Sequence, residues 1–102
     1  MTSSTTYRFS APLWRWKGDG PWHFVTLPFD QADEIDERTT QVQRGFGSVT
    51  VRVTVGRTTW LTSLFPATGE ESYILPVKAA VRKAESLTVG AAVDVTIELV
   101  DL

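Results

Sequence analysis

The sequence predicts a small, mainly β domain in which six strands form a closed or strongly curled sheet, accompanied by two short helices. Residues 49–55 alternate valine with polar side chains, which is the period of two that a half-buried strand requires. A second β-rich run begins at Thr58, directly after a Gly-Arg pair. Two other stretches, near residues 31–39 and 76–85, change to a helical period. Together these observations give the element order β-β-α-β-β-β-α-β.

The Gly-Arg pair at 56–57 predicts a two-residue type II′ turn, because glycine suits its first central position and the turn matches the twist of the flanking strands. The turn sets the register of the hairpin, and one face then carries all four valines and must be covered. The opposite face carries polar side chains but also Leu61 and Phe65, so we expect it to be partly covered too. The predicted pairs are Val55 with Thr58, Val53 with Trp60, Val51 with Thr62 and Val49 with Leu64.

The N-terminal part predicts a tail and a first strand. Residues 1–6 are small and polar and are expected to form a disordered tail, with a single domain over residues 7–102. Apolar side chains at odd positions from Tyr7 to Leu13 indicate a strand, with Trp14 and Trp16 on its other face. Proline at position 12 cannot donate to a ladder, which places this part at an edge or a bulge.

Residues 17–21 (KGDGP) then predict a turn, and residues 22–28 predict the returning strand. After this strand the β alternation stops. A short helix is predicted from Gln31 to Thr39, with Asp30 as its N-cap. Residues 43–47 are expected to form a loop that leads into the hairpin.

The C-terminal part predicts a turn at residues 67–70 and a short strand at 72–75. A helix follows over residues 76–85, with Pro76 in the first helical position, where its missing N–H does no harm. Its apolar stripe is Val77, Ala80, Val81 and Ala84. The final strand covers residues 92–102, with Val93, Val95, Ile97 and Leu99 on its buried face.

Three motifs resemble those of an uncharacterised bacterial family of about 100 residues, a "domain of unknown function". They are W-x-F-x-x-L-P at 22–28, W-x-T-S-L at 60–64 and L-P-V-K-x-x-V-R-K at 75–83. The resemblance implies a barrel or pseudo-barrel of the double-split type, related to AbrB and MazE, and members sometimes occur beside a bacteriocin-protection (YdeI/OmpD-associated) module. It implies no activity. The family usually has Gly-Asp before the last strand, whereas Ala91 follows Gly90 here.

Composition argues against several classes of protein. The net charge of −2 argues against a non-specific nucleic-acid binder, which needs a strong basic field. The absence of cysteine excludes disulfides, thiolate chemistry and cysteine-ligated zinc. No leader-like pattern opens the sequence, and no apolar stretch approaches the ~20 residues of a membrane span. We therefore expect a cytoplasmic protein that contacts no membrane and carries no cofactor or metal.

Few residues have the pattern of catalytic or metal-binding groups. His23 is the only histidine, and we interpret it as a structural or surface side chain. Ser63 lacks a G-x-S-x-G elbow and is interpreted as a strand serine. The acidic side chains of the first predicted helix match no Ca²⁺-loop spacing, so a solvated helix face is the favoured interpretation.

Two surplus features point to binding. The second predicted helix carries a basic patch, to which Arg52 and Arg57 could add to form an anion or phosphate site, although a plain solvent-exposed face is the simpler interpretation. Four tryptophans exceed what a small core readily encloses, and aromatic side chains are enriched in pockets and interfaces. The predicted binding residues are Trp14, Trp16, Trp60, Lys78, Arg82 and Lys83.

We therefore favour a non-enzymatic module that binds an unknown small anionic ligand or a protein partner, as a monomer or homodimer. An enzymatic alternative would use His23, Arg82 and an acidic residue, and it becomes preferable if all three converge in one pocket. A second alternative is an AbrB-like nucleic-acid-binding regulator, against which the net charge speaks.

Overall fold

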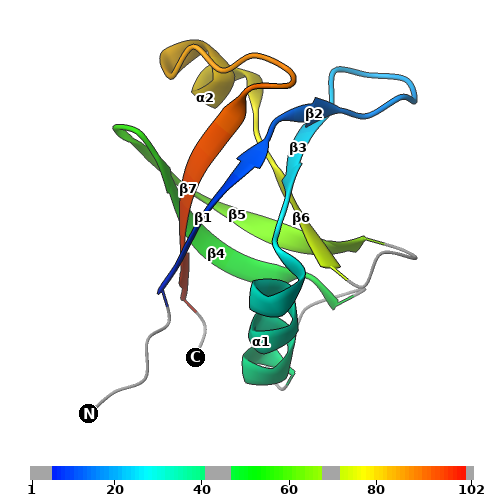
Figure 1. Cartoon of the computed structure of the whole chain (residues 1–102), viewed down its shortest axis with the longest axis vertical. Coiled ribbons are helices and arrows are strands. Elements are labelled where there is room, and N and C mark those ends of the chain that lie inside the picture. The colour runs from blue at the N-terminus through cyan, green and yellow to red at the C-terminus, as the bar shows by residue number, and fades with distance from the viewer. Residues whose placement is uncertain (1–5, 41–46, 68–71, 101–102) are drawn as a thin grey trace.

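A computed structural model describes residues 6–40, 47–67 and 72–100 of the chain. Within these residues the chain forms one antiparallel, curled half-barrel sheet and two short helices (Figure 1). The predicted element order is confirmed, except that the first strand is divided in two. The elements are β1 (Thr6–Pro12), β2 (Trp14–Arg15), β3 (His23–Thr26), α1 (Phe29–Thr39), β4 (Val49–Val55), β5 (Thr58–Ala67), β6 (Ser72–Pro76), α2 (Ala79–Ala84) and β7 (Ala92–Leu99).

The sheet has the strand order β1-β7-β4-β5-β6-β3-β2, so its two edge strands are consecutive in the chain. The first predicted strand is divided at Leu13, whose side chain is buried. Its backbone N–H donates to the carbonyl of Ala91 at 3.1 Å, and its carbonyl accepts from Gly90 at 2.8 Å. Pro12 is the last residue of the edge strand β1 and lies opposite Ala92, which confirms its predicted edge position.

The central hairpin is confirmed in its turn and its register. Gly56 has a φ of 58° and Arg57 does not have a positive φ, as a type II′ turn requires. The four predicted pairs across β4 and β5 are all present. The valines of β4 are buried, and the predicted inward side chains of β7 lie beside them in the same core.

The opposite face of β5 is covered only in part, as expected. Leu61 and Phe65 are 62% and 44% exposed. The two helices lie at opposite ends of the half-barrel (Figure 1).

Both helices begin differently from the sequence prediction. Helix α1 starts at Phe29 with Pro28 as its N-cap, so Asp30 lies inside the first turn and is not the cap. Pro76 is the last residue of β6, where it pairs with Phe24, and therefore does not begin α2. The hydrogen bonding between β3 and β6 continues one residue beyond β6, because the N–H of Val77 donates to the carbonyl of His23 at 2.9 Å.

Helix α2 is accordingly shorter than predicted, and its buried stripe is reduced. Val77 and Val81 are buried, while Ala80 and Ala84 are exposed. A side chain just after the helix ties it to the hairpin: Glu85 Oε2 accepts from Thr58 Oγ1 at 2.6 Å and from the N–H of Arg57 at 3.2 Å.

Four predictions fall wholly or partly outside the described residues. The polar tail is one of them, although its last residue, Thr6, already belongs to β1. The loop at 43–47 and the turn at 67–70 are two others, of which Gly47 and Ala67 alone are described. The fourth is the final strand, predicted over residues 92–102: β7 ends at Leu99, Val100 lies outside the strand, and residues 101–102 are not described.

Tyr73 connects α1 to the sheet, and its ionisation is expected to lower the stability of the fold at alkaline pH. Its hydroxyl donates to Asp36 Oδ1 at 3.1 Å. Burial, assisted by the negative charge of Asp36, raises the pKa of Tyr73 to about 12. Because the folded pKa exceeds the ordinary value of 10.0, the stabilisation is complete below pH 10 and is lost as the pH rises toward 12.

We therefore expect the free energy of unfolding, measured by urea titration at pH 9, 10 and 11, to fall more steeply in the wild type than in Tyr73→Phe. Burial also raises the pKa of Tyr7, which stays in both proteins and contributes equally to both curves. Parallel pH dependences of the two proteins would contradict the prediction.

Candidate functional site

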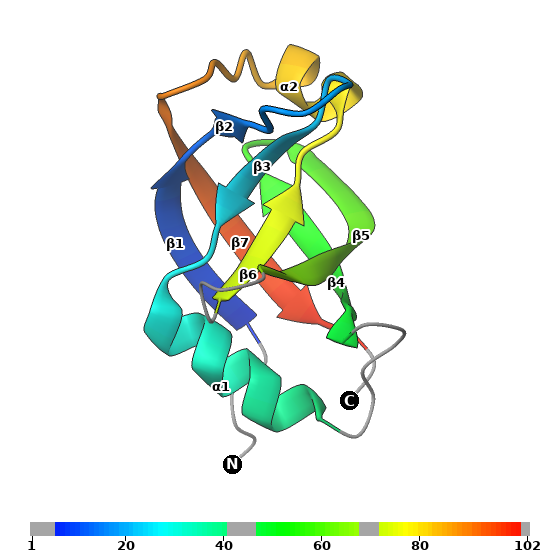
Figure 2. The same ribbon diagram turned by 90° about the vertical axis from the view of Figure 1, so that its right-hand side faces the viewer.

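A cavity of about 430 Å³ lies at the α2 end of the half-barrel. We call it the cationic cavity. Its walls come from the segment entering β3, the middle of β5 and the chain around the start of α2. Figure 2 shows α2 and the loop between β2 and β3 at the same end of the molecule. The lining residues are Pro21, Trp22, His23, Trp60, Leu61, Thr62, Pro76, Val77, Lys78, Ala79 and Arg82.

The fold holds the Arg82 side chain in place within this cavity. The Arg82 Nε–H donates to the carbonyl of Val77 at 3.2 Å, and its Nη1 lies 3.5 Å from His23 Nε2. His23 Nδ1 lies 2.7 Å from the carbonyl oxygen of Pro21. A carbonyl oxygen can only accept, so Nδ1 carries a proton, and an unprotonated Nε2 is then oriented to accept from Arg82. Among the described residues the Arg82 Nη2 group has no protein partner.

The charged side chains that line the cavity are both positive. Lys78 and Arg82 both line it, and no acidic side chain of the described residues does so. Most of the remaining wall is apolar or aromatic, with Trp60 half-buried in it. An anionic group bound here would contact two cationic side chains. The apolar walls would shield it partly from solvent, and a charge-assisted hydrogen bond is stronger there than in bulk water.

A second cavity, of about 380 Å³, adjoins the first and is called the aromatic cavity. The Trp14 and Phe24 rings lie 5.1 Å apart, and the Trp22 and Phe24 rings lie 6.5 Å apart and nearly parallel. Trp14 is fixed by a hydrogen bond from its Nε1 to Thr26 Oγ1 at 2.9 Å. The lining residues are Trp14, Trp16, Trp22, Phe24, Phe65, Ile74 and Pro76.

The predicted binding residues are distributed over both cavities. Trp60, Lys78 and Arg82 line the cationic cavity, and Trp14 and Trp16 line the aromatic one. Lys83 is exposed and lines neither.

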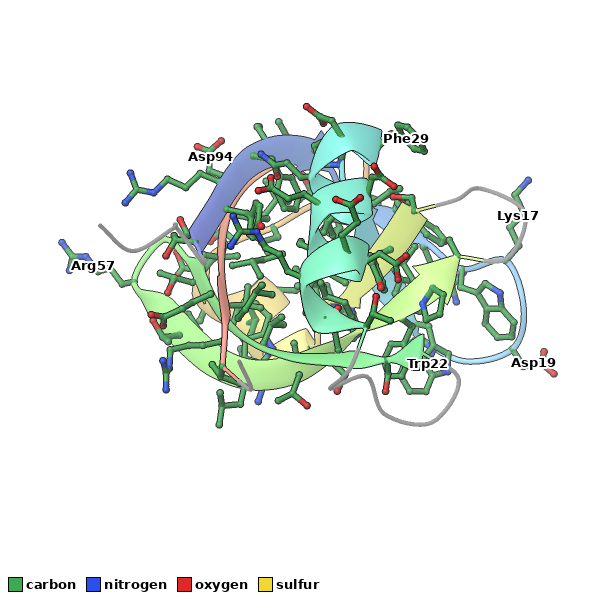
Figure 3. The ribbon with its side chains drawn as sticks, turned by 90° about the horizontal axis from the view of Figure 1, so that it is seen from below. Lys17, Asp19, Trp22, Phe29, Arg57 and Asp94 are labelled. Atoms are coloured by element: carbon green, nitrogen blue, oxygen red, sulfur yellow. The ribbon has the colours of Figure 1, made fainter. Side chains whose placement is uncertain are left out.

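The predicted set of binding residues omitted two residues that line the site, although the enzymatic alternative had paired His23 with Arg82. Trp22 lines both cavities, and His23 supports Arg82. Their position directly after the KGDGP turn was visible in the sequence, but the meeting of this turn with α2 depends on sheet order. Figure 3 shows Trp22 on the same side of the molecule as Lys17 and Asp19.

The larger basic site suggested by the sequence does not form. Arg52 Nη1 pairs with Glu98 Oε1 at 2.7 Å on the outer face of the sheet. Arg57 lies at the opposite side of the molecule from Trp22 (Figure 3). The basic groups of the cavity are therefore Arg82 of α2 and Lys78, the residue that precedes the helix.

The condition set for an enzyme is met only in part. His23 and Arg82 converge in one cavity, but no acidic side chain of the described residues lines it. Residues 6–40, 47–67 and 72–100 contain no group of three or more His, Asp or Glu side chains that could hold a metal ion. Among the same residues, no helix is long and apolar enough to cross a membrane.

Comparison with known proteins identifies the family. No curated protein matches the chain. The model of a family described as a domain of unknown function, DUF1905, matches residues 9–97. This span runs from β1 to β7 and includes both cavities and the three motifs noted in the sequence. Because the match extends over most of the chain, the chain belongs to the DUF1905 family.

Proposed function

We propose that this protein is a non-enzymatic binding module that takes a small organic anion in the cationic cavity. The observation that carries the proposal is the combination of Lys78 and Arg82 with apolar and aromatic walls and no acidic lining side chain among the described residues. Binding sites for small molecules are typically mostly apolar hollows with a few placed polar groups, and the cavity volume of about 430 Å³ suits such a ligand.

The geometry of Arg82 favours binding over catalysis. Its Nε–H is engaged by the carbonyl of Val77, and one Nη group approaches His23. The guanidinium is thereby oriented before a ligand arrives, which lowers the entropy lost on binding. His23 directs its proton to a backbone carbonyl, so its role in the proposal is to position Arg82.

Benzoate is a suitable probe, and benzamide is its neutral isostere. We expect the Trp60 indole N–H signal in a ¹H–¹⁵N spectrum to shift on titration with benzoate, and benzamide to bind at least about tenfold more weakly. Arg82→Gln should weaken benzoate binding by about tenfold or more, because a hydrogen bond to a charged group contributes roughly 1.5–3 kcal/mol.

Lys83→Gln is the matched control, because it removes a positive charge from the same helix outside the cavity. Benzoate affinity should change less than about twofold in this variant, as expected for an exposed charge. Equal binding of benzoate and benzamide, or equal losses in the two variants, would show that the cavity is not an anion site.

The resemblance adds finer points to the proposal, namely a double-split barrel type and a bacterial, cytoplasmic setting. The alternative of an AbrB-like DNA-binding regulator is supported by no specific feature of the described residues. A gel-shift assay at low salt with short duplex DNA tests it, since binding through phosphates would weaken steeply with added salt.

A further inference from the structure

We propose that the cationic and aromatic cavities form one elongated site for an amphipathic organic acid, whose anionic group meets Arg82 and whose hydrocarbon body lies across Trp22 toward Trp16. This inference rests on the proposed function and specifies its ligand class: a free, water-soluble acid with an extended apolar part.

The two cavities adjoin each other at two shared lining residues. Trp22 and Pro76 line both of them. The Trp22 side chain is 55% exposed, so its ring is available to a ligand along much of its surface. A molecule that is seated at Arg82 and long enough to reach Trp22 would therefore contact a residue that also lines the aromatic cavity.

The charge of the combined site is confined to one end. Lys78 and Arg82 line the cationic cavity, whereas no charged side chain of the described residues lines the aromatic one. A ligand charged at both ends would leave one charge against aromatic rings without a partner, which is unfavourable. A neutral apolar ligand would leave the two cationic side chains without an anionic partner. A single anionic group with an apolar body complements both ends.

The loop between β2 and β3 holds the aromatic end in shape. The N–H of Trp16 donates to the carbonyl of Trp22 at 2.9 Å, which closes the loop. A Cβ atom on Gly18 would overlap the Trp16 ring, and one on Gly20 would lie 3.2 Å from the Trp22 ring. The two glycines therefore give the two indole rings the space in which they pack against the loop backbone. An arrangement fixed before binding suits a ligand site, because less order must be imposed on binding.

The affinity for straight-chain carboxylates should rise with chain length. We expect binding by wild-type protein to strengthen from acetate through butanoate and hexanoate to octanoate, by roughly twofold per methylene, since complete burial would give about fourfold. The Trp60 indole N–H signal should shift with every acid, and those of Trp14 and Trp16 only with the longer ones.

Gly18→Ala tests the aromatic end separately from the cationic end. The new methyl group should displace the Trp16 ring, so octanoate binding should weaken about three- to tenfold while acetate and benzoate binding is unchanged. Trp16→Ala should give the same pattern by removing the ring, and it serves if Gly18→Ala does not fold. Arg82→Gln should weaken binding of all these acids by about tenfold.

The outcomes separate this inference from the proposed function. Benzoate binding through Arg82 without any gain from acetate to octanoate would overturn the inference and leave the proposed function standing. Failure of every carboxylate would overturn both. Octanol binding as tightly as octanoate, or sedimentation with phosphatidylglycerol vesicles that persists in Arg82→Gln, would also overturn the inference, because the occupant would then be an apolar molecule or a lipid surface.

Discussion

Leu64→Ala is expected to lower the free energy of unfolding by about 3 kcal/mol, within the range for a leucine removed from a packed core. Leu64 is completely buried on β5 and lies opposite Val49, in the face that the β4 valines share. Truncation removes its burial and leaves a cavity that rigid strands on both sides cannot fill. For a domain of about 100 residues, this loss corresponds to a decrease in Tm of roughly 15 °C.

Leu61→Ala is the matched comparison on the same strand. Leu61 is 62% exposed and lies on the other face of β5, so its truncation should change the free energy of unfolding by less than about 0.5 kcal/mol. Urea unfolding of the two variants under identical conditions measures both values. Similar losses for the two leucines would mean that the curl of the sheet does not separate an inner face from an outer one.

Gly56→Ala should destabilise the protein by about 2–3 kcal/mol through two effects at the hairpin turn. Gly56 has a φ of 58°, a conformation that costs a residue with a Cβ roughly 1–2 kcal/mol. The added Cβ would also overlap the Glu85 carboxylate. Glu85 must then move away from the Thr58 hydroxyl, which donates a hydrogen bond to its carboxylate at 2.6 Å. Because this hydrogen bond ties the end of α2 to the hairpin, its loss would loosen that attachment. Thermal and urea unfolding measure the combined loss.

Gly90→Ala separates the two effects. Gly90 also has a positive φ, of 91°, but a Cβ there would meet nothing within 4 Å. Its substitution should therefore show the backbone part of the loss alone and be the milder of the two. Gly56→Ala should also be less harmful in a Glu85→Ala background, where the steric conflict is gone. Equal losses for Gly56 and Gly90 in the wild-type background would remove Glu85 from the explanation.

The elements that were predicted well are those whose own residues determine them. The four valines of β4 and the glycine that follows them define a strand, a turn and a register without help from the rest of the chain. The errors lie where distant segments compete for the same residues. Pro76 has every property of a first helical residue, but its pairing with Phe24 keeps it in β6. Division of the first strand at Leu13 depends on contacts with Gly90 and Ala91, which no local pattern reveals.

The candidate site was likewise predictable only where local sequence decides the outcome. Residue type singled out the tryptophans and the basic side chains of the second helix. Their grouping could not be derived, because it depends on which strands neighbour one another. Exposed Lys83 belongs to the same sequence cluster as Arg82 but lines neither cavity. His23 lies 59 positions from Arg82 and reaches it only through the pairing of β3 with β6.

The position of β7 between β1 and β4 has a consequence for how the protein folds. Thr6 lies opposite Glu98, so the first described strand pairs with the last, across almost the entire chain. Joining such distant segments requires closing a very long loop, which is slow compared with forming the β4-β5 hairpin. During synthesis, β1 has no partner until β7 has left the ribosome. The hairpin is therefore the natural nucleus, and closure of the sheet along β1 and β7 is expected to be a late step.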